Sequence, residues 1–62
     1  MNYGVKNFND GLIEDRHKYE TFEEARHTAT SLSDWNIECA IVDLKTNAEL
    51  KHFTPYQNMF QK

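Results

Sequence analysis

The side chains of this sequence that could do chemistry are three histidines and one cysteine. His17, His27 and His52 each stand among charged residues, in the segments DRHKY, EARHT and LKHF. A histidine transfers protons near neutral pH, and together with Glu14 or Arg16 it could cleave RNA. Because the three histidines are scattered over charged segments, we expect solvated surface groups, and a small RNase-like enzyme is only the third hypothesis for function.

Metal binding and nucleophilic catalysis have less support. No two histidines stand four residues apart, and a single cysteine can neither form an internal disulfide nor complete a zinc-finger pattern. Cys39 lies in the most apolar segment, where burial raises the pKa of a thiol and makes it inert. The two glycines, at 4 and 11, form no phosphate-binding loop. We predict no catalytic residue, no metal ion and no cofactor.

Length and charge limit the remaining classes. The chain has 62 residues and a net charge of −3, from seven basic and ten acidic side chains. This balance is ordinary for a soluble protein and argues against a dominant role in binding a phosphate backbone. The N-terminal segment lacks a charged region followed by an apolar stretch, and the longest apolar run is Cys39 to Val42. We expect one small cytoplasmic domain without a signal peptide or membrane span.

A short basic segment keeps nucleic acid as the alternative partner. In RHKY, an extended backbone would place Arg16 and Lys18 on one face and His17 and Tyr19 on the other, with Lys6 on the paired strand. Basic groups beside aromatic rings are typical of proteins that bind single strands. The alternative site therefore comprises Lys6, Arg16, Lys18 and Tyr19, although acidic residues flank it on both sides.

The elements that hold these residues begin with a hairpin. NYGVKNF and LIEDRHKYE have the character of strands, and Asn9-Asp10-Gly11 between them tolerates positive φ. The second strand would carry Ile13 and Tyr19 on one face. Its many charges suit the edge of a sheet.

The segment TFEEARHTATSLSDW predicts a helix over about residues 21–34. Thr21 and Glu24 form a capping box at its start. Apolar residues then recur at helical spacing, and they predict a stripe that packs on one face of a sheet: Phe22, Ala25, Ala29 and Leu32. Trp35 is expected to close the end of the core.

Residues 36–53 predict a second hairpin whose first strand is apolar on both faces. One face would carry Ile37, Cys39 and Ile41, and the other would carry Ala40, Val42 and Leu44. The single helix covers only one face of the sheet. We expect the face of Ile37 and Ile41, together with Phe53, to need another cover.

The tail provides part of that cover. Thr54 and Pro55 are helix start signals, and Tyr56, Met59 and Phe60 would share one face of a short helical turn. So short a helix is unstable unless it docks on something. The predicted fold is therefore an α+β domain over residues 1–54, with a small antiparallel sheet in ββαββ order, the helix on one face, and a helical turn over 55–62.

The incompletely covered face favours protein binding as the function, because exposed apolar patches mark interaction sites. The predicted partner-binding residues are Ile37, Ile41, Phe53, Tyr56, Met59 and Phe60. The partner would be another protein or a second copy in a homodimer. In size and layout the chain resembles small proteins of phages and other mobile elements. This resemblance implies a non-catalytic inhibitor or modulator that occupies the surface of a host or defence protein.

Overall fold

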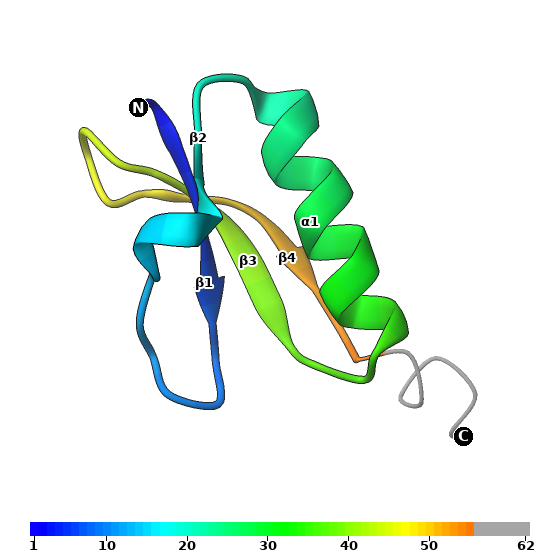
Figure 1. Cartoon of the computed structure of the whole chain (residues 1–62). Coiled ribbons are helices and arrows are strands. Elements are labelled where there is room, and N and C mark those ends of the chain that lie inside the picture. Colours follow the sequence, from blue (N-terminus) through cyan, green and yellow to red (C-terminus); the bar gives the residue numbers. More distant parts are fainter. Residues whose placement is uncertain (56–62) are drawn as a thin grey trace.

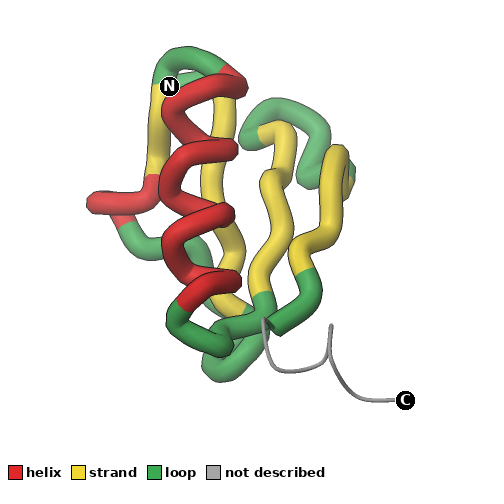
Figure 2. Tube along the Cα trace, turned by 90° about the vertical axis from the view of Figure 1, so that its right-hand side faces the viewer, coloured by secondary structure: helices red, strands yellow, loops and turns green. Residues whose placement is uncertain are grey.

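The structure, a computed structural model, describes residues 1–55. The elements in chain order are β1 (Tyr3–Asn7), the short 3-10 helix η1 (Asp15–His17), β2 (Lys18–Tyr19), α1 (Phe22–Asp34), β3 (Cys39–Asp43) and β4 (Glu49–Phe53). The strands form one antiparallel sheet in the order β2-β1-β3-β4, and α1 covers one of its faces (Figures 1 and 2). The predicted α+β class and helix placement are confirmed, and the ββαββ order matches roughly, with η1 inserted between β1 and β2.

The centre of the sheet is the pair β1 and β3, which align from Tyr3 opposite Asp43 to Asn7 opposite Cys39. At one edge, β2 contributes only two residues to its pairing with β1. At the other edge, β4 follows β3 until a bulge, where Leu50 is the extra residue between the partners of Ile41 and Val42.

The first hairpin is present, but its second strand is far shorter than predicted. Gly11 has a φ of 72°, as the turn requires, and Leu12 pairs back to Asn7. The chain then leaves the sheet and turns through η1 before β2 begins. The expectation that Ile13 and Tyr19 share a face is wrong, because this interruption breaks the alternation: Tyr19 packs against the core under α1, whereas Ile13 lies over Gly4.

Both ends of α1 are closed by local hydrogen bonds. The predicted capping box is present: Glu24 N–H donates to Thr21 Oγ1, and Thr21 N–H donates to Glu24 Oε1, both at 3.2 Å. At the other end Asn36 has a φ of 66°, and its N–H donates to Ser33 O while the Ile37 N–H donates to Leu32 O. This pair of bonds is the Schellman pattern, and it ends the helix at Trp35.

The core lies between α1 and the sheet. Its fully buried side chains are those of Val5, Ala25, Ala29, Cys39 and Ile41, and five larger residues pack around them: Tyr3, Tyr19, Phe22, Leu32 and Phe53. The predicted helical stripe is thus confirmed as the buried face. The two alanines let α1 lie close to the strands, since their side chains take little space between the two layers. Trp35 does not close the core, because the Schellman turn leaves its side chain 79% exposed.

The assignment of the two faces of β3 needs correction. Ile41 and Cys39, which were predicted to face away from the helix, are fully buried beneath it, and Phe53 packs on the same side. Ile37 precedes β3 and does not belong to the sheet. The second face instead carries Ala40 and Val42, which alternate with the core residues. Tyr56, Met59 and Phe60 and their predicted helical turn lie outside the described residues.

Candidate functional site

The second face of the sheet is covered in part by the chain's own loops. Ile13 and Leu44 lie over Gly4 so closely that a Cβ there would be 2.7 Å from Ile13 Cγ2 and 2.9 Å from Leu44 Cδ2. Ala40 is fully buried and Val42 is 5% exposed on this face. The loop after β1 therefore supplies much of the cover that was expected from the tail or from a partner.

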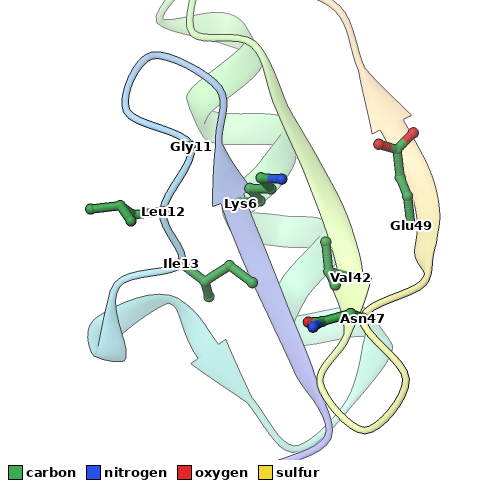
Figure 3. A pocket seen from close by; sticks show the side chains of 7 residues that line it. All are labelled: Lys6, Gly11, Leu12, Ile13, Val42, Asn47 and Glu49. Carbon is green, nitrogen blue, oxygen red and sulfur yellow. The ribbon is translucent and has the colours of Figure 1, made fainter.

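A groove remains open beside this cover, and we call it the loop groove. It has a volume of about 490 Å³ and is lined by Lys6, Gly11, Leu12, Ile13, Val42, Asn47 and Glu49. Figure 3 shows α1 behind the sheet, Ile13 directed over β1 toward the sheet, and Leu12 directed away from it. Val42 and Ile13 give the groove an apolar floor, and Leu12, which is 61% exposed, lies at its rim.

The rims of the loop groove carry opposite charges. Lys6 comes from β1, and its ammonium group lies 5.7 Å from the centre of the Phe8 ring without an ion pair to any residue from 1 to 55. Glu49 comes from β4 across the groove, and its Oε2 lies 3.6 Å from His52 Nδ1. The groove thus offers one cation and one carboxylate on either side of an apolar floor.

His52 is held in place beside the loop groove. Its Nε2 lies 2.8 Å from Glu38 Oε2, and its ring meets the ring of Phe8 edge to face at 5.0 Å. The Phe8 N–H also donates to Glu38 O, which extends the pairing beyond β1. These contacts join the segments that flank β1 and β3 to β4, and they give His52 a structural role.

A second groove runs along the other side of the molecule, between α1 and the segment of η1 and β2. We call it the helix groove; its volume is about 440 Å³, and it is lined by Arg16, His17, Tyr19, His27, Thr28, Ser31, Leu32 and Trp35. Within the described part of the chain, no carboxylate lines it. Three of its side chains, those of Arg16, His17 and His27, carry basic nitrogen groups.

Several polar groups of the helix groove have unused hydrogen-bonding capacity. Thr28 Oγ1 donates to Tyr19 Oη at 2.5 Å, so the tyrosine proton is free for another acceptor. His17 Nδ1 is buried and has no hydrogen-bond partner among residues 1–55. Arg16 uses only Nε, which donates to Glu14 Oε1 at 2.6 Å, and the rest of its guanidinium makes no bond to a described residue. A ligand with acceptor oxygens would meet the free donors of Tyr19 and Arg16.

The predicted nucleic-acid residues do not form one site. Arg16 and Tyr19 line the helix groove, but Lys6 lines the loop groove on the other face. Lys18 Nζ lies 3.0 Å from Asp15 Oδ1. The prediction assumed one continuous strand, whereas η1 turns Arg16 and His17 out of the strand alternation. Sequence reasoning also missed Ile13, Asn47 and Trp35 as groove residues; only Trp35 carried a signal, as the chain's lone tryptophan.

The predicted inertness of Cys39 fits its surroundings. Its Sγ lies 3.4 Å from Ala29 O, and burial, with a smaller effect of Glu38, raises the pKa of the thiol to about 11. Among residues 1–55, no group of three or more histidine, cysteine, aspartate or glutamate side chains is arranged to hold a metal ion. None of the described helices is both long and apolar enough to span a bilayer.

Comparison of the chain with protein-family models, with curated proteins and with solved structures found no significant match.

Proposed function

We propose that this chain is a non-catalytic module that binds another protein through the loop groove. The observation that carries the proposal is the loop groove on the second sheet face, where the half-buried Ile13 and the 61% exposed Leu12 offer apolar surface between two charged rims. Exposed apolar patches with polar rims mark interaction sites. By resemblance to small proteins of mobile elements, the bound surface would be one whose occupation inhibits a host protein in the cytoplasm.

The charges of the groove specify the chemistry of the partner. Lys6 favours a carboxylate on the partner, and Glu49 across the floor favours a basic side chain. Between them, Ile13 and Leu12 would accept an aliphatic side chain. The fitting partner segment therefore presents an acidic, an apolar and a basic residue along one face.

The groove supports this proposal better than the free edge of β4 does. An exposed strand edge can pair with a partner strand, but β4 carries the bulge at Leu50 and the charged residues Glu49 and Lys51. Bulges and charges are the features by which natural sheets prevent edge pairing. Binding over the second face avoids this obstacle.

The proposal can be tested by selecting short random displayed peptides on the purified protein. We expect enriched peptides that combine an acidic and a basic residue around an aliphatic one. Selection on the Lys6→Glu variant should abolish the preference for the acidic residue. The matched control is Lys51→Glu, because Lys51 lies on the helix side of the sheet, 5.6 Å from the Phe53 ring; it should leave the preference unchanged.

Amide chemical shifts locate the binding. On addition of a selected peptide, the shifts of Lys6, Ile13, Val42 and Glu49 should change most. Peptides without a common pattern, or shifts centred on α1, would refute the proposal. Sedimentation of the peptide-free protein tests whether a second copy of the chain occupies the groove. A dimer that Lys6→Glu dissociates would show that it does.

A further inference from the structure

The helix groove has the features of a ligand site that is independent of the loop groove. It lies between α1 and the edge formed by η1 and β2, at the opposite edge of the sheet from β4. From the described contacts of this groove, we propose that it binds a short stretch of single-stranded nucleic acid, with a base on Trp35 and phosphate oxygens beside Arg16.

Trp35 supplies the platform for a base. It is the only tryptophan of the chain, and 79% of it is exposed at the end of α1. Its backbone is fixed by the Schellman bonds of Asn36 and Ile37, so the indole projects from a rigid helix end. Bases stack on such rings with little dependence on sequence, since every base has a flat aromatic face.

The groove beside this ring is suited to an anion. Its ionisable side chains other than Tyr19 are Arg16, His17 and His27, and one of them, Arg16, keeps its terminal amino groups free of bonds to described residues. The Glu14 carboxylate accepts from the Arg16 Nε, and Glu14 does not line the groove. Phosphate oxygens would accept from the guanidinium, where planar donors match their geometry.

Neutral donors complete the site. The Tyr19 hydroxyl accepts from Thr28 and retains its own proton, and Ser31 adds a second hydroxyl to the lining. The buried and unpaired His17 Nδ1 shows that hydrogen bonding in this groove is incomplete in the free protein. A ligand with both a ring and several acceptor oxygens would engage Trp35, Arg16 and the hydroxyls of Tyr19 and Ser31, and a nucleotide unit is such a ligand.

The size and charge of the site favour a single strand over a duplex. A groove of about 440 Å³ holds a small ligand, and the net charge of the protein is −3. Few phosphates are neutralised, so binding is weak and only mildly sensitive to salt. With one or two phosphate contacts, the logarithm of the binding constant should fall with the logarithm of salt concentration with a slope of about −0.7 to −1.4.

The test uses the full chain with fluorescein-labelled oligothymidylate and oligouridylate of about eight nucleotides, a length within the usual range of single-strand sites. Fluorescence anisotropy should show that both oligonucleotides bind at low salt. The same oligonucleotides without the label should quench the Trp35 emission. Trp35→Ala should weaken binding about 5- to 150-fold, the equivalent of about 1–3 kcal/mol per stacked base, and Trp35→Phe should restore part of it. Arg16→Ala should make the salt slope smaller in magnitude by about 0.7.

The matched control is Lys51→Ala, which removes the same charge from β4 at the other edge of the sheet and should leave binding unchanged. The proposal would be overturned if Lys51→Ala weakened binding as much as Arg16→Ala does, or if a duplex bound more tightly than a single strand. An oligoglutamate of similar length that binds as tightly as the oligonucleotides would also overturn the proposal, since it would show that the groove recognises acidic protein segments. Variants of Lys6 should not affect oligonucleotide binding, so this outcome is separate from that of the loop groove.

Discussion

The side chain of Ile13 lies across Gly4, and a Cβ at residue 4 would come within 2.7 Å of Ile13 Cγ2. This contact explains how so small a chain covers the second face of its sheet. The absence of a side chain at Gly4 leaves the space in which Ile13, from the loop after β1, and Leu44, from beyond β3, come together. Ile13 therefore both covers the second face of the sheet and lines the loop groove.

The first prediction follows from that contact. Gly4→Ala should destabilise the protein by about 1–3 kcal/mol, because overpacking forces Ile13 to move. Roughly 0.4–1 kcal/mol of this cost is offset, since alanine reduces the conformational entropy of the unfolded chain relative to glycine. Urea denaturation measures the difference. In an Ile13→Ala background only the 2.9 Å approach to Leu44 Cδ2 remains, so Gly4→Ala should cost less there than in the wild type. Equal costs in both backgrounds would show that the two residues are not coupled.

The second prediction concerns the corrected face of β3. Ile41→Ala should cost about 2–5 kcal/mol, since Ile41 is fully buried between α1 and the sheet and its truncation leaves a cavity. Thermal or urea unfolding provides the measurement. Leu50→Ala is the matched control: Leu50 is 47% exposed at the bulge, and its truncation should cost far less. Similar costs for the two variants would contradict the placement of Ile41.

The sequence predicted the elements whose signals are local. The capping box of Thr21 and Glu24 and the spacing of Ala25 and Ala29 are set within one helix, so the start and the buried face of α1 follow directly from them. The turn at Gly11 is local in the same way. These features depend on neighbouring residues and not on the rest of the fold.

The faces of β3 and the grooves depend on distant contacts, and the sequence did not reveal them. Both faces of β3 are apolar, so alternation alone could not decide whether Ile41 or Val42 faces the helix. The departure of Ile13 from the strand is set by its contact with Gly4, nine residues earlier in the chain. Trp35 is a large aromatic residue of the kind that commonly packs in a core. The Schellman turn at Asn36 places it on the surface instead.

The third prediction concerns the start of α1. Thr21→Ala should reduce stability by about 0.5–2 kcal/mol, because the Glu24 N–H loses its acceptor at the helix terminus. Thr30→Ala is the control, since Thr30 is an exposed residue in the middle of the same helix and alanine favours helix there. Circular dichroism during urea titration gives both values. A cost for Thr21→Ala no larger than that for Thr30→Ala would mean that the cap contributes nothing to stability.

The last prediction is a pH dependence that originates at Cys39. Burial raises the pKa of its thiol from 9.0 to about 11 in the folded protein. Below pH 9 both states hold the proton, so the contribution to stability is constant. Between about pH 9 and 11 the unfolded chain releases the proton while the native state keeps it, so the free energy of unfolding falls as the pH rises. The fall cannot exceed about 1.4 kcal/mol per pH unit for one group.

The measurement must compare wild type with Cys39→Ala, so that the contributions of all other groups cancel. The variant removes the thiol and its contact with Ala29 O, which lowers stability by an amount independent of pH below 9. Above pH 9 the wild type should lose stability faster, and the two unfolding curves should converge. Parallel curves from pH 8 to 11 would show that the thiol ionises as easily in the folded as in the unfolded protein, and Cys39 would then have to be within reach of solvent.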